Sequence, residues 1–284
     1  MQVEPHLRST TCPYCASPAV VDRPPDPSRP RPTFILTFVV PHERALEAAR
    51  RWVRRRWLAK EAFRRAKVAA IRGIYVPSYL FSAAAHAEYS ARIGEQYTET
   101  YTTTDSKGRT VTRTRTKTEW HTLSGPYAAY VSDVVVTASR GIPNGELEGI
   151  EPFDLRALHR YSPGLVSGWI AEEASMAAEE CRQLAAQEAM AEVKRRVAAI
   201  LPGDTQAGLE VSARLSEIDQ ELILVPVWVL PVRFGEGPEE VVRVLVNGQT
   251  GKAFATTPRS WAKITALIIL AVLVIAGGIY LASH

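Results

Sequence analysis

The longest hydrophobic pattern in the chain is an apolar run near its C-terminal end. Residues Ile264–Ala282 carry no charged side chain, and eleven of these nineteen residues are Ile, Leu or Val. As a helix, the run would be about 28 Å long, which is close to the hydrocarbon thickness of a bilayer. We therefore predict a single transmembrane anchor over residues 263–283. Arg259 and Lys263 lie just before the run, so the positive-inside rule predicts a cytoplasmic body.

Residues 42–70 have the apolar spacing of an amphipathic helix. Leu46, Ala49, Val53 and Trp57 form one stripe, and arginines surround it. This spacing predicts one helix, or two helices joined end to end.

A second long helix is predicted over residues 172–199, and Pro202–Gly203 would end it. Its acidic residues come early and its basic residues late, the order that complements the helix dipole. The acidic residues are Glu172, Glu173, Glu179 and Glu180, and the basic residues are Lys194, Arg195 and Arg196.

Most other segments read as strands. The segment 97–118 predicts a hairpin that turns at DSKG, because its threonines alternate strictly with Val111, Arg113, Arg115 and Lys117. Neither face of this hairpin is apolar, so we expect it to project into water. Further strands are predicted at 34–40, across the rest of 71–139, and at 209–217, 222–232, 240–247 and 252–256. The predicted fold class is α+β, with a mainly antiparallel sheet, two long helices and the C-terminal transmembrane helix.

The predicted organisation has five parts. A partial zinc-ribbon knuckle (1–23) and a proline-rich linker (24–32) precede an α+β body at 33–256. A short linker (257–262) then leads to the anchor at 263–283. Two similar proline-containing segments, at 75–81 and 224–230, suggest that the body consists of two related halves, 33–140 and 150–256, although chance similarity is the alternative.

The charge of the chain is concentrated in one segment. The formal net charge is +4, whereas residues 42–70 hold ten Lys or Arg against three Glu, a local charge of +7. The candidate residues for binding an anionic surface are Arg50, Arg51, Arg54 and Arg55 in the helix and Arg113, Arg115 and Lys117 in the hairpin. The partner would be lipid headgroups or a nucleic-acid backbone. The alternative is a solvated surface of salt-bridged arginines, which we favour slightly for the hairpin.

Cys12 and Cys15 form a CxxC pair, the geometry of one zinc knuckle. A structural zinc needs four ligands, and no second CxxC is present in the sequence. We therefore expect an incomplete site with less than one zinc per chain. A zinc shared between two chains and a redox CxxC are the less favoured alternatives.

The sequence offers no recognised catalytic motif. It contains no GxxxxGK[ST] phosphate loop, and no GxSxG, HExxH or GxGxxG motif. His121 and His159 each lie near an aromatic residue, a setting in which histidine is more often structural than catalytic. We therefore predict that the chain is not an enzyme.

Several segments together resemble a family of bacterial membrane proteins that have an N-terminal zinc ribbon of the TFIIB type. The segments are CPYCAS at 12–17, RRW and RRRWLAKEAF ending at Phe63, IRGIYVPSYLF at 71–81, SG at 124–125, EPFDL at 151–155, YSPGLVSGWIAEE at 161–173, LVPVWVL at 224–230 and VNGQTGK at 246–252. Members often carry the automatic label primosomal protein N′ or superfamily II helicase. The resemblance implies a single-pass protein of the bacterial inner membrane, with zinc bound in relatives. This chain departs from the family pattern, because it has no earlier CxxC and Ala16 replaces the usual glycine.

Two functional hypotheses follow from these observations. The first is a membrane-anchored cytoplasmic adaptor or scaffold that binds an unidentified protein and has no catalytic activity. The second is a nucleic-acid-associated zinc-ribbon protein that uses the basic helix 42–70. An unrecognised hydrolase would need convergent acid–base groups in a pocket.

Overall fold

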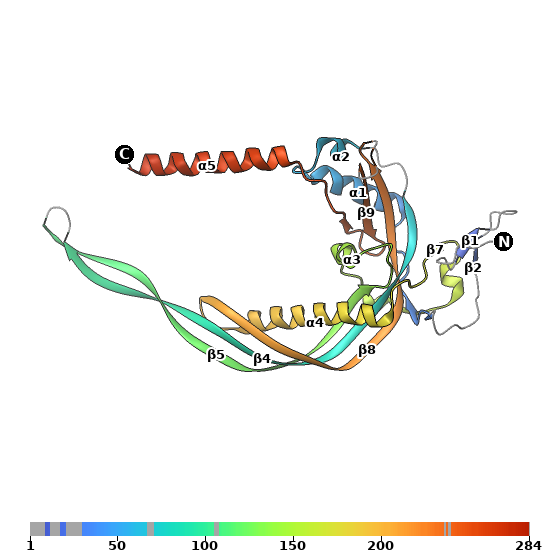
Figure 1. The fold of residues 1–284 in the computed structure, drawn as a ribbon, viewed down its shortest axis with the longest axis horizontal. Helices are drawn as coiled ribbons and strands as arrows, with labels where there is room; N and C mark the ends of the chain where they lie inside the picture. The colour runs from blue at the N-terminus through green and yellow to red at the C-terminus, as the bar shows by residue number, and fades with distance from the viewer. Residues whose placement is uncertain are drawn as a thin grey trace. The chain divides into compact units, whose positions relative to one another are not determined.

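The computed structural model describes residues 9–11, 18–20, 30–66, 71–104, 108–235, 237 and 240–283 (Figure 1). Cys12 and Cys15, the predicted metal ligands, lie outside these residues. The described chain combines helices with extensive sheet, which confirms the prediction of a mixed helix-and-strand fold in its coarse form. The sheet itself is mixed, because some strand pairs are parallel and others antiparallel.

The chain folds into two compact units, and neither is continuous in sequence. Unit 1 contains Met1–Tyr79, Val136–Ala178 and Glu221–His284, and unit 2 contains Leu80–Val135 and Glu179–Gln220. The predicted halves, 33–140 and 150–256, do not coincide with these units, since each unit takes residues from both halves.

Three long strands contribute residues to both units. They are β4 (Arg72–Thr104), β5 (Thr110–Thr137) and β8 (Thr205–Arg233). Sequence periodicity suggested separate strands at 209–217 and 222–232, but β8 is continuous through both segments. A β-strand can run on past a change from an exposed to a buried environment, because its backbone pairing does not depend on side-chain polarity.

The remaining strands of unit 1 are short, apart from β9. They are β3 (Phe34–Ile35), β6 (His159–Arg160), β7 (Ile170–Ala171), β9 (Val241–Asn247) and β10 (Ala253–Phe254). They follow the order β10-β9-β8-β3-β6, while β7 pairs with β4. The β3–β8 and β4–β7 pairs are parallel, and β8–β9 and β9–β10 are antiparallel. Outside this sheet, β1 (Ser9–Thr11) pairs with β2 (Pro18–Val20).

Pro226 lies between the stretch of β8 that pairs with β3 and the stretch that pairs with β9. Before it, Ile223 and Leu224 pair with β3, and after it Val227 begins the pairing with β9. Proline has no N–H to donate, so β8 tolerates it in this gap between the two paired stretches. In the order of the strands, β9 and β3 lie on opposite sides of β8.

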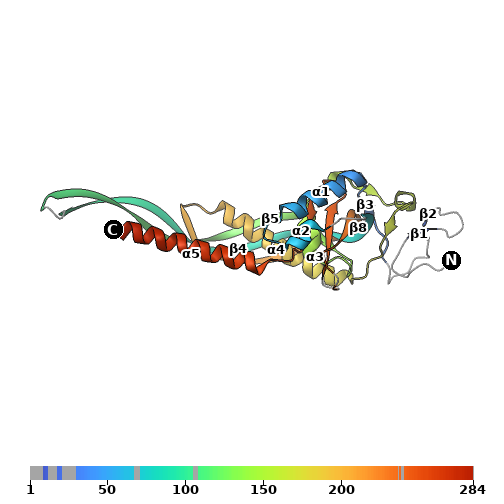
Figure 2. The same ribbon diagram turned by 90° about the horizontal axis from the view of Figure 1, so that it is seen from above.

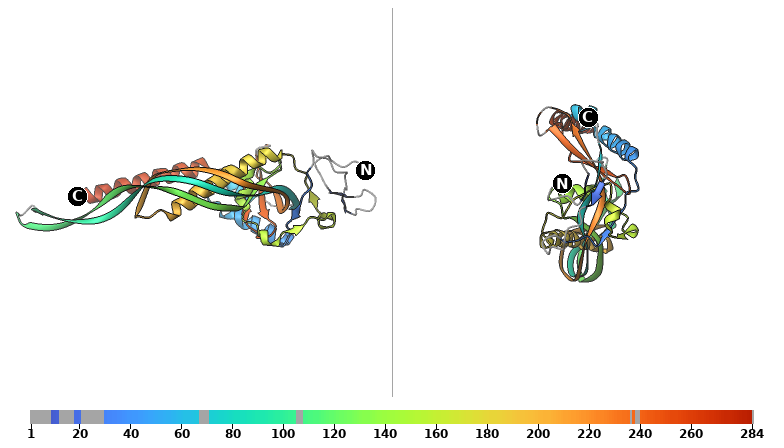
Figure 3. Two further views of the ribbon diagram at one scale, coloured as in Figure 1. Left: turned by 90° about the horizontal axis from the view of Figure 1, so that it is seen from below. Right: turned by 90° about the vertical axis from the view of Figure 1, so that its right-hand side faces the viewer.

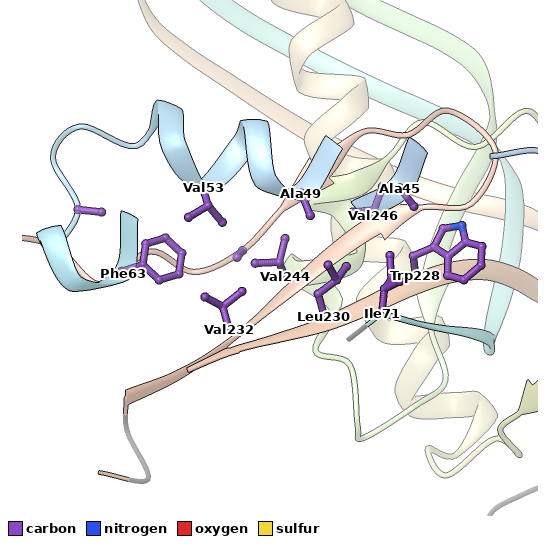
Figure 4. Close-up of a cluster of buried hydrophobic side chains, with 12 residues drawn as sticks. Ala45, Ala49, Val53, Phe63, Ile71, Trp228, Leu230, Val232, Val244 and Val246 are labelled. Atoms are coloured by element: carbon purple, nitrogen blue, oxygen red, sulfur yellow. The ribbon is translucent and has the colours of Figure 1, made fainter. Parts of the chain in front are cut away.

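Two helices cover one face of the β8–β9 sheet (Figure 4). The first, α1 (His42–Arg55), buries Ala45, Ala49 and Val53, and the short α2 (Glu61–Arg65) buries Phe63. These side chains pack on Trp228, Leu230 and Val232 of β8 and on Val244 and Val246 of β9. The segment 42–66 thus forms two joined helices. Trp57 does not continue the apolar stripe: it lies beyond the end of α1 and is 56% exposed.

Gly73 of β4 is closely packed against two tryptophan rings. A Cβ at this position would lie 2.5 Å from the ring of Trp169 and 3.1 Å from the ring of Trp228. Trp169 in turn stacks on Phe38, with ring centroids 4.1 Å apart. Residues of β4 alternate between the two faces of the sheet, so Arg72 and Ile74 point away from this aromatic cluster.

The NGQTG segment is a structural turn. Asn247 is fully buried, its Oδ1 accepts the backbone N–H of Gln249 and Thr250, and its Nδ2 donates to the carbonyls of Ile150 and Pro152. One side chain therefore joins the β9 turn to the end of α3 (Asn144–Ile150). The 3-10 helices η1 (Leu155–Ala157) and η2 (Pro163–Val166) follow α3.

Unit 2 consists of long strand segments with helix α4 (Ala178–Ile200) along them (Figure 3). Small side chains are frequent among the buried residues of α4 and of the part of β4 in unit 2. The buried residues are Cys181, Ala185, Ala189, Val193 and Val197 of α4 and Ala83, Ala85, Ala87, Ala91 and Ile93 of β4. Glu172 and Glu173 precede this helix, so the predicted start was six residues early. Arg195 and Arg196 form ion pairs with Glu192 one turn back.

Candidate membrane-proximal surface

Helix α5 (Trp261–Ser283) differs from α1, α2 and α4, because its apolar side chains are exposed instead of being packed on a sheet. Its segment Trp261–Gly278 has a mean hydropathy of 2.2, and none of that segment is buried. Leucine, isoleucine and valine side chains between Leu267 and Ile275 are 39–66% exposed. The helix is long and apolar enough to cross a membrane, as the sequence predicted.

The start of α5 is fixed to the turn between α1 and α2 (Figure 2). The Ser260 N–H donates to the carbonyl of Leu58 at 2.9 Å, and the Lys60 N–H donates to the carbonyl of Pro258 at 3.0 Å. Ala59 and Arg259 form an antiparallel bridge between these two bonds. Within the predicted linker 257–262, residues 258–260 therefore pair with residues 58–60, and Trp261 begins α5.

Lys263 adds a side-chain connection at the same place. Its Nζ donates to the carbonyl of Trp57 at 2.9 Å and to that of Ala59 at 3.2 Å, and it lies 3.5 Å from the Glu61 carboxylate. Glu61 also accepts hydrogen bonds from Arg65 at 2.9 Å and from Arg64 at 2.8 Å. These bonds, the one from Arg65 first, hold the pKa of the Glu61 carboxyl below its ordinary value. We call this set of contacts between 57–61 and 258–263 the anchor clamp.

The four arginines predicted to bind an anionic surface all lie on α1, immediately before the anchor clamp. Arg50, Arg51, Arg54 and Arg55 are exposed, while the opposite face of the helix is buried. Arg56 stacks on Trp52, with its guanidinium carbon 4.2 Å from the ring centroid. The arginines thus present their charge outward from the helix that adjoins the start of α5.

Two exposed tryptophans accompany these charges. Trp57 belongs to the anchor clamp, and Trp261, 72% exposed, begins α5. Tryptophan and basic side chains are the residues enriched where a membrane-spanning helix meets the aqueous phase. The sequence showed each residue, but only the anchor clamp brings the segments 57–61 and 258–263 together.

The three hairpin residues lie in unit 2, on the two-stranded part of β4 and β5, where almost all side chains are exposed. Glu99 forms ion pairs with Lys117 at 2.9 Å and Arg115 at 2.6 Å, and these contacts lower its pKa. Arg115 also lies over the ring of Tyr101. Two of the three predicted cations are therefore paired, and Arg113 has no hydrogen bond or ion pair to any described residue.

Among the described residues, no group of three or more His, Cys, Asp or Glu side chains is placed to hold a metal ion. His121 lies 3.7 Å from Glu95, with both side chains about half exposed or more. Within the described chain, neither side chain of this exposed pair forms a hydrogen bond or ion pair with a third residue.

No protein-family model matches the chain, and no solved structure is significantly similar to it. The chain is similar to the uncharacterized protein YdjG of Bacillus subtilis (strain 168). The two sequences are 23% identical over 256 residues, which cover 88% of this chain and 70% of YdjG. The similarity therefore extends across most of both proteins.

Proposed function

We propose that this protein is a membrane-anchored adaptor: α5 spans the bilayer, and the body binds a partner protein at the membrane surface without catalysing a reaction. The anchor clamp is the observation that best supports this proposal. A body attached by a flexible linker would need no backbone pairing at the start of α5. An adaptor that binds its partner close to the membrane benefits from this pairing, because the pairing limits the movement of α5 relative to the helices α1 and α2.

The body would lie on the cytoplasmic side of a bacterial inner membrane. Arg259 precedes α5 and Lys263 lies in its first turn, and the exposed arginines of α1 lie near the same end of the helix. Basic residues that flank a spanning helix favour the cytoplasmic side, and each basic residue near an anionic leaflet gains roughly 1 kcal/mol within a Debye length. Anionic lipid is thus a second, surface-level partner of α1.

The hairpin is the best candidate for the partner-binding surface. Its exposed aromatic side chains include Tyr97 at 47%, Tyr101 at 38% and Trp120 at 41%. Tyrosine, tryptophan and arginine dominate the energetics of protein interfaces, because they bury a large area at low entropic cost. Arg113, with no partner in the described chain, adds an uncompensated charge to this surface.

The test is affinity purification of the full-length chain, after cross-linking in native membranes. We expect one protein to co-purify with the natural chain and to be lost when Tyr97 and Tyr101 are changed to Ser. A variant with Thr112 and Thr114 changed to Ser, on the same hairpin, should retain the partner. Equal recovery with both variants would show that the hairpin is not the binding surface.

The exposed arginines of α1 also favour a second candidate, a nucleic-acid-associated protein. Retention of the purified chain on DNA or RNA that weakens with rising salt would support this function, because phosphate contacts release counterions. Absence of retention at low salt would exclude it.

A further inference from the structure

A pocket of about 450 Å³ lies within unit 1, on the face of the sheet opposite α1 and α2. Trp228, Leu230 and Val232 of β8 pack toward the helices, so Val229 and Pro231 point to the other face and line the pocket. The aliphatic floor of the pocket is completed by Ile74 of β4, by Ile170 of β7 and by Ile142, which precedes α3. This volume is within the range of small-molecule sites in proteins.

Three charged side chains stand around this floor, and two of them are already held. Arg243 donates to the Glu146 carboxylate from Nε at 3.2 Å and from Nη2 at 2.8 Å, and its Nη1 donates to the carbonyl of Gly141. Glu172 accepts a hydrogen bond from the Ser139 hydroxyl at 2.7 Å, and that hydroxyl accepts the Gly141 N–H at 3.0 Å. Arg243 and Glu172 are therefore fixed as parts of the wall.

The third charged group, Arg72, is different. It is exposed at the pocket, and its guanidinium has no hydrogen bond or ion pair with any residue in the described part of the chain. The parallel β4–β7 register pairs Ile74 with Ile170. Arg72 lies two residues before Ile74, and Glu172 lies two residues after Ile170. The backbone positions of Arg72 and Glu172 are thus about 13 Å apart along the strands, and Ile74 and Ile170 lie between them.

We propose that this pocket binds a short aliphatic carboxylate, with its carboxylate on the Arg72 guanidinium and its branched chain on Ile74, Ile170 and Val229. A guanidinium matches a carboxylate with two parallel hydrogen bonds, and the adjoining apolar surface excludes water from them. Glu172 keeps the pocket close to neutral, which suits a singly charged head group better than a dianionic phosphate. The proposal is independent of the adaptor function, since it needs neither the hairpin nor the anchor clamp.

Two sources could supply this chemistry: a free organic acid, or the C-terminal residue of a polypeptide that ends in leucine. The probes are 4-methylpentanoate for the first source and N-acetyl-Ala-Ala-Leu for the second. Tighter binding of the peptide would identify a polypeptide C-terminus, and tighter binding of the free acid would identify a metabolite. Either result supports the assignment of the pocket.

The experiment is isothermal titration of the full-length chain in nanodiscs of zwitterionic lipid, with empty nanodiscs as the blank. We expect 4-methylpentanoate to bind about tenfold or more tightly than 4-methylpentan-1-ol, 4-methylpentylamine or acetate, because only the first ligand satisfies both Arg72 and the floor. Arg72→Gln should weaken carboxylate binding about tenfold and leave the alcohol unchanged. Arg51→Gln, an exposed arginine of α1, is the matched control and should leave both unchanged.

Val229→Phe tests the floor independently of the charge. The added ring should fill the pocket and weaken the acid and the alcohol together. Amine binding as tight as carboxylate binding would overturn the proposal. So would an unchanged affinity in Arg72→Gln, or no saturable binding of either carboxylate at about 10 mM.

Discussion

The ammonium group of Lys263, in the first turn of α5, donates a 2.9 Å hydrogen bond to the carbonyl of Trp57, 206 residues earlier in the chain. Trp57 lies two residues after the end of α1. A basic residue next to a transmembrane helix is usually explained by membrane topology alone. Here the same lysine also joins the helix to the body of the protein.

Replacement of Lys263 should therefore loosen the anchor clamp. Lys263→Gln removes two hydrogen bonds and the Glu61 contact, and a loss of about 1–2 kcal/mol in local stability is expected. Hydrogen exchange of the Lys60 and Ser260 amides should then be about 5–30 times faster. Lys194→Gln, an exposed lysine of α4, should leave both rates unchanged, and equal rates in Lys263→Gln would show that the backbone pairing alone holds the clamp.

The exposed arginines of α1 should make the body bind anionic membranes. We expect a fragment of residues 33–258 to bind vesicles of anionic lipid weakly and in a salt-dependent manner, with up to roughly 1 kcal/mol from each arginine that reaches the surface. Changing Arg50, Arg51, Arg54 and Arg55 to Gln should abolish that binding in a sedimentation assay. Because all four side chains are exposed, the circular dichroism spectrum should not change.

The hairpin provides the control for that experiment. Changing Arg113, Arg115 and Lys117 to Gln removes three positive charges, compared with four on α1. These residues lie in unit 2, and two of them are paired with Glu99. Their replacement should leave vesicle binding largely intact. Equal binding of the natural fragment to neutral and anionic vesicles would contradict the electrostatic explanation.

Glu151 should make the body less stable as the pH rises. Burial, with a smaller contribution from nearby Glu148, raises the pKa of the Glu151 carboxyl to about 7, and its Oε1 has no hydrogen-bond partner in the described chain. Below pH 4.5 the group is neutral in both the folded and unfolded states. Between pH 4.5 and 7 only the unfolded chain ionises, so the folded state loses stability with rising pH.

Glu151→Gln should remove this penalty. We expect a gain of about 2 kcal/mol in the free energy of unfolding at pH 8, discounted for the partial exposure of the side chain, and little gain at pH 4. The gain in the free energy of unfolding is measured by denaturant unfolding of fragment 33–258 at pH 8 and at pH 4. Glu47→Gln, on the exposed side of α1, should show no such difference, and a pH-independent gain in Glu151→Gln would point to packing instead.

Replacement by alanine should destabilise the protein at Ser139 but not at Ser78. Both are buried, but the Ser78 hydroxyl has no partner in the described chain, whereas the Ser139 hydroxyl donates to Glu172 and accepts the Gly141 N–H. Ser78→Ala should be neutral or stabilise by up to about 1 kcal/mol, because a buried unsatisfied hydroxyl is costly. Ser139→Ala should destabilise by about 1–2 kcal/mol in the same unfolding assay.

Sequence periodicity located elements better than it located their ends. The stripe Leu46, Ala49 and Val53 identified α1, because a helix that covers a sheet must repeat its apolar residues every three to four positions. The same stripe failed at Trp57, where the helix has ended. For α4, a run of glutamates looked like a helix start, but Glu172 instead bonds to Ser139.

The candidate sites also divide into features that the sequence predicts and features that depend on the tertiary structure. Exposed arginines on α1 could be expected from the sequence, since a helix with one buried face leaves its charges on the other. The neutralisation of Arg115 and Lys117 by Glu99 depends on the hairpin register, which sets residues 16 and 18 positions apart side by side. The pocket had no sequence signal, because Arg72, Glu172 and Val229 come from segments that are far apart in the chain.

The sequence by itself determined the apolar helix α5, the mixture of helices and strands, and the concentration of positive charge in residues 42–70, because each is a property of consecutive residues. Only the tertiary structure decided that Lys263 and Trp57 meet, that β8 is one strand shared by two discontinuous units, and that Arg72 borders an aliphatic pocket. These relationships join residues about 100 to 200 positions apart. Local propensity and periodicity carry no information on such contacts, which are fixed by strand pairing and by the packing of side chains between layers.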